Sequence, residues 1–202
     1  MLPMGRRALL VEVESTERAQ ALHAELLRLR EAGELPAVDE IVPAAVTVLV
    51  DGVDDPVALA ERLRGLEVPE KASSHAASVV LPVRYDGPDL TDVASLWGTT
   101  EEDVVALHTG TEFRVAFCGF APGFGYLTGL PEALRVPRRA TPRTAVPPGS
   151  VGLAGPYTGV YPRTSPGGWQ LIGQTDAVLW DVTREPAALL SPGTRVRFEA
   201  VA

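Results

Sequence analysis

The pattern of apolar and polar residues in the first part of the chain predicts short strands mixed with two amphipathic helices. Short apolar or β-branched runs predict three strands, at 8–13, 39–42 and 46–50. Two sets of apolar residues recur at helical spacing and predict helices: Ala19, Leu22, Leu26 and Leu29, then Leu59, Leu63 and Leu66. Ser15 or Thr16 is the expected cap of the first helix, and Asp55, ahead of Pro56, that of the second.

A stretch without periodicity, residues 69–77, follows these elements and predicts a linker. We therefore expect two domains, with the first over residues 1–72 and the second over residues 73–202. The order strand, helix, strands, helix predicts that the first domain is an α+β sandwich.

The second part of the chain is expected to be mostly β. Apolar runs predict four strands, at 78–85, 112–117, 177–182 and 195–201. Thr91 is the expected cap of a short helix that ends at Gly98. Thr100 and Asp103 have the spacing of a capping box, which predicts the start of a further helix.

Residues 117–175 differ in composition from the rest of the chain. They are rich in glycine and proline, which favour turns and close backbone approaches. No acidic residue lies between Glu132 and Asp176, although the chain has a formal net charge of -8. The arginines of this interval are Arg135, Arg138, Arg139, Arg143 and Arg163. Because guanidinium groups bind phosphate and carboxylate through forked hydrogen bonds, the segment predicts a site for a small anion. The alternative is that these arginines pair with acids elsewhere in the fold.

The overall composition excludes several classes of protein. With 202 residues, 46% of them hydrophobic and 22% charged, the chain has ordinary globular composition. An isoelectric point near 4.9 argues against nucleic acid as the main partner. The single cysteine, Cys118, cannot form an intrachain disulfide, which favours a reducing compartment. The apolar run near the N-terminus is too short for a signal peptide or a membrane span, so we expect a cytoplasmic protein that acts away from membranes.

Few side chains are candidates for proton transfer or nucleophilic attack. His108 lies near a predicted helix C-terminus, where the helix dipole would favour its protonated form, or else it is a packed histidine. Cys118 ends an apolar strand and is more typical of a packing residue than of a nucleophile. Ser150 lacks the spacing of a GxSxG elbow, and the sequence contains no GxxxxGK[ST] motif for a nucleotide.

Three motifs carry a resemblance to a known family: PGFGYLTGL, PRRATPRTAVPPGSVGLAG and TGVYPRTSPGGWQLIGQT. They closely resemble the family called allophanate hydrolase subunit 1, also described as the 5-oxoprolinase B subunit and as the Kip-type kinase inhibitor (carboxyltransferase domain, subdomains C and D). The resemblance covers nearly the whole chain. It implies an N-terminal α+β domain and a cyclophilin-like β-barrel domain that carries residues 117–175.

The resemblance also implies a function. By this resemblance, the chain is expected to be a non-autonomous subunit of an ATP-dependent amide hydrolase, 5-oxoprolinase. That enzyme opens 5-oxo-L-proline to L-glutamate and releases ADP and phosphate. The implied partners are a chain of the allophanate hydrolase subunit 2 type, equivalent to the 5-oxoprolinase C-type subunit, and a barrel-type chain, the A-type subunit. ATP, with Mg²⁺, is the implied cofactor, and no biotin is expected on this chain, whose only lysine is Lys71.

A candidate site follows from matching the family motifs position by position. The resemblance implies catalytic roles for His108, Arg138 and Arg143. It implies contacts with substrate or nucleotide at Phe120, Pro122, Gly123, Phe124, Tyr126, Arg139, Tyr161, Ser165, Gly167, Gly168 and Trp169. The chain departs from the family pattern at Gly125, where proline is usual, and at Tyr157, where a polar residue is common.

Two other functions are compatible with the sequence. One is a carboxyltransferase-like component of urea or allophanate metabolism, which would need biotin elsewhere in its complex. The other is a binding module that inhibits a sensor histidine kinase, since a docking surface for a helical partner leaves no fixed motif.

Overall fold

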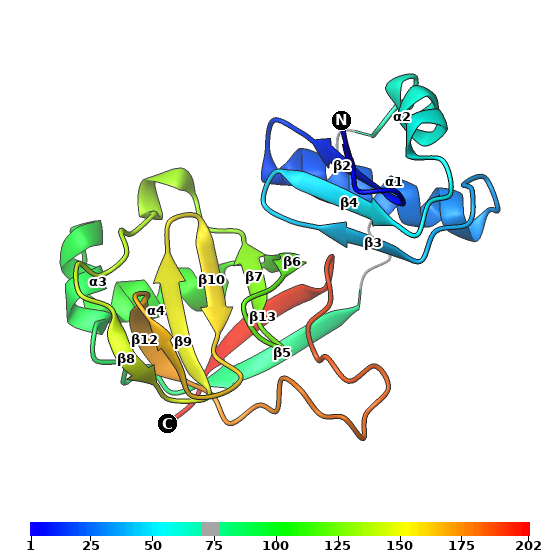
Figure 1. Ribbon diagram of the computed structural model, residues 1–202. Helices are drawn as coiled ribbons and strands as arrows, with labels where there is room; N and C mark the ends of the chain where they lie inside the picture. Colours follow the sequence, from blue (N-terminus) through cyan, green and yellow to red (C-terminus); the bar gives the residue numbers. More distant parts are fainter. Residues whose placement is uncertain (70–76) are drawn as a thin grey trace. The chain divides into compact units, whose positions relative to one another are not determined.

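The computed structural model describes residues 1–69 and 77–202 (Figure 1). Its chain forms two compact units, Met1–Ala76 and Ala77–Ala202. The boundary expected between residues 72 and 73 lies outside the described residues.

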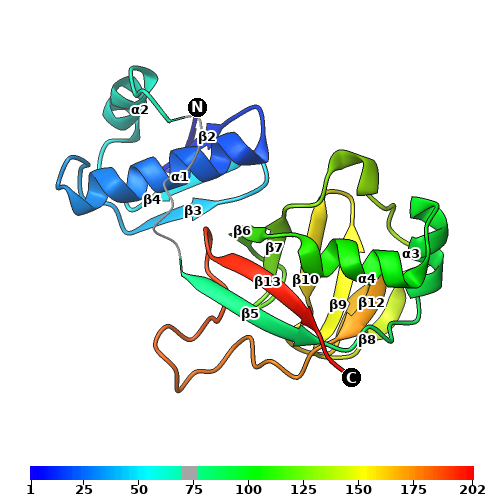
Figure 2. The same ribbon diagram turned by 180° about the vertical axis from the view of Figure 1, so that it is seen from behind.

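The first unit is a four-stranded antiparallel sheet with two helices on one face. Its strands, in the order β1-β2-β4-β3, are β1 (Leu2–Met4), β2 (Ala8–Glu12), β4 (Thr47–Asp51) and β3 (Glu40–Pro43). The helices α1 (Thr16–Glu31) and α2 (Pro56–Arg64) bury their apolar stripes in one cluster with side chains of the sheet. Figure 2 shows α1 lying across the sheet. Both predicted helices are therefore confirmed, as are the predicted strands, whereas β1 was not predicted.

Side chains cap the two helices of this unit as the sequence suggests. The Ser15 hydroxyl accepts a hydrogen bond from the Arg18 amide at 3.2 Å. The Asp55 carboxylate accepts from the amides of Val57 at 3.1 Å and Ala58 at 2.9 Å. Because these amides have no partner inside their helices, each cap contributes about 1 kcal/mol to stability.

The second unit is built on a seven-stranded sheet that is nearly closed into a barrel. Around the sheet, the strands are β12 (Gln170–Gln174), β9 (Ser150–Ala154), β10 (Tyr157–Val160), β7 (Gly125–Thr128), β6 (Phe113–Cys118), β13 (Arg195–Ala200) and β5 (Ser78–Val83). Arg84, just beyond β5, exchanges backbone hydrogen bonds with Gln174 of β12 at 2.9 and 2.8 Å. These bonds join the two ends of the sheet.

Shorter elements surround the barrel. They are the helices α3 (Leu90–Trp97) and α4 (Glu101–Gly110), the 3₁₀ turn η1 (Glu132–Leu134), and a two-stranded ribbon of β8 (Arg143–Val146) and β11 (Ser165–Gly167). The predicted capping box of Thr100 and Asp103 is confirmed. Thr91 is not the cap of α3, because Asp89 holds that position.

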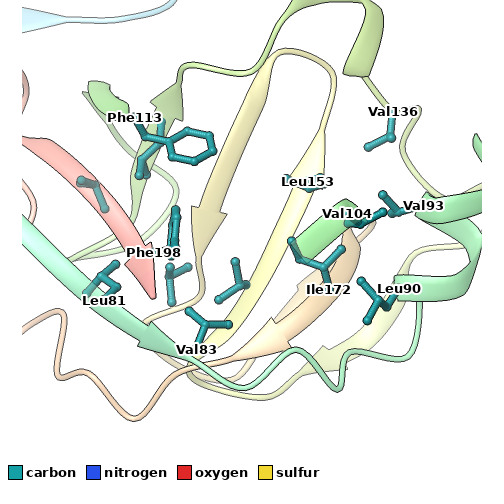
Figure 3. Packing of buried hydrophobic residues seen from close by; sticks show 14 of the residues in the cluster. Leu81, Val83, Leu90, Val93, Val104, Phe113, Val136, Leu153, Ile172 and Phe198 are labelled. Carbon is teal, nitrogen blue, oxygen red and sulfur yellow. The ribbon is translucent and has the colours of Figure 1, made fainter. Parts of the chain in front are cut away.

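The core of the second unit lies inside the barrel. Figure 3 shows Leu81 of β5 near Phe198 of β13, and Ile172 of β12 near Val104 and Leu90 of the helices. Phe113 and Phe198 are almost completely buried there. Each such side chain contributes about 1.5–3 kcal/mol by its removal from water.

The prediction of a strand at 177–182 is wrong. These residues form an irregular loop between β12 and β13, with one isolated bridge between Trp180 and Ala188. The Asp181 carboxylate accepts hydrogen bonds from the amide and hydroxyl of Thr183, which turns the chain at this point. The prediction of mixed α and β structure with a barrel-like sheet is confirmed, whereas its cyclophilin-like character and the division into two domains stay predictions.

Candidate anion-binding pocket

A small pocket of about 90 Å³ lies on the second unit, and every residue that lines it belongs to the predicted site. The lining residues are Phe120, Phe124, Tyr126, Arg138, Tyr161, Gly167, Gly168 and Trp169. They come from β7 and the loop before it, the position directly after β10, the end of β11 and the two residues after it, and the segment after η1. Residues up to 49 positions apart are thus brought to one place, which the sequence motifs predicted without showing how. Whether they bind a ligand stays a prediction.

Aromatic rings form the walls of the pocket. The ring of Phe124 packs edge to face with Tyr161 at 5.4 Å and with Trp169 at 5.5 Å between centroids. Gly159 of β10 lies beneath the rings, where a Cβ atom would come within 2.9 Å of Phe124 Cζ and 3.0 Å of Trp169 Cζ3. Glycine at this position therefore permits the rings to approach the strand.

We expect the substitution Gly159→Ala to lower the free energy of unfolding by about 1–3 kcal/mol, because the added methyl group overpacks the aromatic wall. Urea denaturation followed by tryptophan fluorescence measures this change. Gly155→Ala is unsuitable as a control because Gly155 has a positive φ of 55°, whereas Gly110→Ala adds a Cβ with no atom within 4 Å. A Gly159→Ala protein as stable as the Gly110→Ala protein would contradict the expectation.

Phe120 stands on the rim of the pocket in a conformation that costs energy. Its φ of 66° is the only positive value among the non-glycine residues of the described chain, and the residue is 55% exposed. A left-handed conformation costs about 1–2 kcal/mol for a residue with a Cβ. The surrounding turn holds it in place, since the Phe124 amide donates to the Ala121 carbonyl at 2.9 Å. A strained and exposed aromatic side chain beside a pocket is typical of a ligand-contacting position.

Arg138 supplies the positive charge of the pocket. Its side chain is exposed, and it makes no ion pair within residues 1–69 and 77–202. Burial raises the pKa of the Tyr126 and Tyr161 phenols, and the Arg138 charge opposes this rise in both. The guanidinium group is therefore close enough to both rings to act on them electrostatically. Both phenols stay neutral near pH 7, so they can donate hydrogen bonds to an anion.

Unlike Arg138, both Arg139 and Arg143 form ion pairs with an acidic side chain. Both donate to the Asp89 carboxylate, Arg143 from Nη2 at 2.7 Å and Arg139 from Nη1. Asp89 is 1% exposed and also accepts from the Leu171 amide at 2.7 Å. Neither arginine lines the pocket. For these two residues the geometry supports the alternative of pairing with a distant acid, and a direct catalytic role for Arg143 or ligand contact by Arg139 is not supported.

Three further predicted residues lie outside the lining. Pro122 is exposed beside Phe120. Gly123 has a φ of 85°, and a Cβ there would meet Trp180 Cβ at 2.9 Å, so it packs against the loop after β12 instead. The Ser165 hydroxyl donates to the Arg163 carbonyl at 3.1 Å and is buried. These residues shape the loops around the pocket.

His108 lies in the hydrophobic core and not in the pocket. It is fully buried, with the rings of Phe113 and Phe198 at 4.9 and 4.4 Å from its own, and the Tyr85 hydroxyl lies 2.7 Å from Nδ1. Burial lowers the pKa of His108 to about 3, so the ring is neutral near pH 7. The geometry therefore supports the packed histidine that the sequence left open, and it does not support the predicted catalytic role.

The buried His108 should make the protein sensitive to mild acid. The pKa of His108 is about 3 in the folded state, below the ordinary value of 6.5, so the unfolded state binds a proton first as the pH falls. Stability should therefore decline below about pH 6.5, by up to about 1.4 kcal/mol per pH unit. Urea denaturation between pH 7 and 4.5 measures the slope, which should be smaller in a His108→Gln protein. Burial lowers the pKa of His23 too, so a residual slope is expected. Equal slopes in the two proteins would contradict the assignment.

The sequence did not predict Asp89 as the partner of Arg139 and Arg143. Asp89 lies in a turn about 50 positions before the arginines, and a turn is an ordinary place for aspartate. The one signal in the sequence is the position of Asp89 directly before an apolar helix, which indicates a helix cap and not an ion pair.

Residues 1–69 and 77–202 contain no group of three or more His, Cys, Asp or Glu side chains that could hold a metal ion. None of the helices in those ranges is long and apolar enough to cross a membrane.

Comparison with known proteins identifies the family. The family described as carboxyltransferase domain, subdomain C and D, matches residues 1–190. The chain belongs to this family. Two relatives within it are named as the B subunit of 5-oxoprolinase. The protein from Escherichia coli O157:H7 is 47% identical over 173 residues, which are 82% of this chain and 79% of the relative. The protein from Haemophilus influenzae is 45% identical over 157 residues, which are 76% and 74%.

Several solved structures are also similar to this chain. TTHA0988 is 38% identical, with a TM-score of 0.78 over 97% of this chain, and this chain spans 40% of that longer protein. The uncharacterized protein PH0987 from Pyrococcus horikoshii is 32% identical, with a TM-score of 0.59 over 98% of this chain and 96% of its own length. The urea carboxylase of Kluyveromyces lactis is 20% identical, with a TM-score of 0.70 over 97% of this chain and 21% of its own, which shows a shared fold only.

Proposed function

We propose that this chain is a non-autonomous component of a 5-oxoprolinase-type complex, and that its pocket binds the carboxylate of 5-oxo-L-proline. The observation that carries the proposal is Arg138, a guanidinium group at an aromatic pocket that makes no ion pair in the described ranges 1–69 and 77–202, in a chain 47% identical to a 5-oxoprolinase B subunit. A fork of N–H donors fits a carboxylate, and aromatic walls fit the apolar edge of a small ring.

The size and charge of the pocket favour a small substrate over a nucleotide. Its volume of about 90 Å³ is below the roughly 300 Å³ of typical sites for larger ligands. A triphosphate requires several cations or backbone donors, and Arg138 is the only cation in the lining. We therefore place ATP, with Mg²⁺, on another chain of the complex. The residues of this chain bind and orient the substrate in the proposed reaction.

The proposal also explains why the chain needs partners. No residue in the pocket lining is an acid, a base or a nucleophile near neutral pH, because the two phenols that line it are held neutral by burial. The groups that open the amide ring must come from elsewhere. The partners we propose are the C-type and the barrel-type A-type subunits of a 5-oxoprolinase, in the cytoplasm, where ATP is available.

Reconstitution tests the proposed function. The chain is co-purified with a C-type subunit, an A-type subunit is added, and ADP release is measured with and without 5-oxo-L-proline. We expect 5-oxo-L-proline-dependent ADP release by the three chains together and none by this chain alone. A complex that assembles but releases no ADP with 5-oxo-L-proline would contradict the proposal. Inhibition of a sensor kinase by the chain alone would then favour the binding module, and biotin-dependent activity the carboxyltransferase-like component.

A further inference from the structure

A buried carboxylate outside the pocket connects the two segments that form its wall. Asp89 is the N-cap residue of α3, yet its side chain makes no hydrogen bond to that helix. Its Oδ1 accepts from Arg139 and Arg143 instead, and its Oδ2 accepts from the Leu171 amide at 2.7 Å. The Asp89 amide in turn donates to the Leu171 carbonyl at 3.0 Å. One side chain therefore joins the arginine segment to the start of β12.

The anchored arginines hold the pocket residues directly. The Arg139 amide donates to the Gly168 carbonyl at 2.8 Å, and Arg143 pairs with Gly167 in the ribbon of β8 and β11. Gly167 and Gly168 both line the pocket. The pocket wall and the arginine segment are thus one hydrogen-bonded unit with Asp89 behind it.

The backbone of Arg138 is held on both sides by this unit. Before it, the Pro137 carbonyl accepts from the Gln170 side-chain amide at 3.2 Å. After it, Arg139 is fixed by its amide and by its guanidinium group. The side chain of Arg138 itself is exposed and lines the pocket. The backbone position from which this side chain projects is therefore held by its neighbours.

The same contacts decide which arginine is available to a ligand. The side chains of Arg139 and Arg143 are 32% and 23% exposed, and each uses donors on Asp89. One carboxylate oxygen, Asp89 Oδ1, accepts from both guanidinium groups, and neither arginine lines the pocket. Of these three arginines, Arg138 is the one that lines the pocket and makes no ion pair within the described residues, so its fork is available to an incoming anion.

We propose that Asp89 is a positioning residue, which holds Arg138 at the pocket by anchoring Arg139 and Arg143. The identity of the ligand rests on the proposed function above. The position of Arg138 does not, so the two can be tested separately.

Tyr126 reports the position of Arg138 in the absence of ligand. Burial raises its pKa, the Arg138 charge lowers it, and the neighbouring Tyr157 raises it. The pKa of Tyr126 is measured by NMR of ¹³C-labelled tyrosine in the full chain. We expect it to rise in Asp89→Asn and in Arg138→Ala, and to rise no further when both changes are combined.

The direction of this change separates displacement of Arg138 from loss of the fold. Unfolding would remove the burial and lower the pKa of Tyr126 toward the ordinary value. A folded Asp89→Asn protein with an unchanged pKa of Tyr126 would overturn the proposal. If Asp89→Asn does not fold, Arg139→Gln is measured instead, because it removes one anchor and leaves Asp89 paired with Arg143. The pKa of Tyr126 is expected to rise in the Arg139→Gln protein too, and an unchanged pKa in that folded protein would overturn the proposal.

Binding of 5-oxo-L-proline to the assembled complex provides the second arm. Asp89→Asn is expected to weaken binding about tenfold, the effect of losing one charge-assisted hydrogen bond. In an Arg138→Ala background it should have little further effect. Equal weakening in both backgrounds would overturn the positioning role. If the unaltered complex does not bind 5-oxo-L-proline, the proposed function fails, and the tyrosine measurement still decides whether Asp89 holds Arg138 at the pocket.

Discussion

Replacing Arg138 with alanine is expected to weaken binding of 5-oxo-L-proline to the assembled complex by at least tenfold, about 1.4 kcal/mol. The change removes the only cation that lines the pocket. Because the side chain is exposed and makes no ion pair in the described residues, its loss leaves no buried charge behind, and stability should change by less than about 0.5 kcal/mol. Isothermal titration calorimetry gives the affinity, and thermal denaturation gives the stability.

Arg163 offers a matched control for this experiment. It lies in the same glycine- and proline-rich segment, is exposed, and does not line the pocket. Arg163→Ala removes the same charge and should leave the affinity unchanged. Arg138→Lys keeps the positive charge but loses the forked donors of guanidinium. Its affinity for 5-oxo-L-proline should therefore lie between those of Arg138→Ala and Arg163→Ala. Equal affinities in Arg138→Ala and Arg163→Ala would show that the pocket does not use Arg138.

The substitution Asp89→Ala should have the largest effect on stability. It leaves two partly buried guanidinium groups without their carboxylate and the buried Leu171 amide without its acceptor. Removal of one partner from a buried ion pair costs about 3–5 kcal/mol. Urea denaturation at pH 7 measures the loss.

Asp92 is the control for the Asp89→Ala measurement. It is an exposed acid in the first turn of α3, so Asp92→Ala removes only a favourable interaction with the helix dipole, worth about 0.3–1 kcal/mol. If the two substitutions destabilise the protein equally, the Asp89 carboxylate is not the buried anchor that the distances indicate.

Local signals in the sequence predicted much of the secondary structure. The caps at Ser15, Asp55 and Thr100 depend on residues within three positions of one another, so they can be read from the sequence directly. The strand predicted at 177–182 failed because apolar residues alone do not make a strand. In the described chain that segment turns at Asp181 instead.

The sequence predicted the aromatic residues and Arg138 of the candidate site, but it did not predict the ion pairs of Arg139 and Arg143 with Asp89. The motifs that contain Phe124, Tyr161 and Trp169 carry the resemblance, and these residues do come together. The pairing of arginines with Asp89 spans about 50 positions, and neither the motifs nor the local charge pattern contains it. His108 was ambiguous for a related reason, because the ring closest to it, Phe198, comes from a strand far along the chain.

The place of β13 in the barrel has a consequence for the order of folding. Although β13 is the last strand along the chain, it lies between β6 and β5 and pairs with β5 in parallel. More than a hundred further residues must therefore be synthesised after β5 before its parallel neighbour, β13, leaves the ribosome. Non-local parallel pairing of this kind forms slowly and exposes an unpaired strand edge in the meantime. We expect nascent chains that stop before Arg195 to need a chaperone, and full-length chains to lose that need once β13 has inserted.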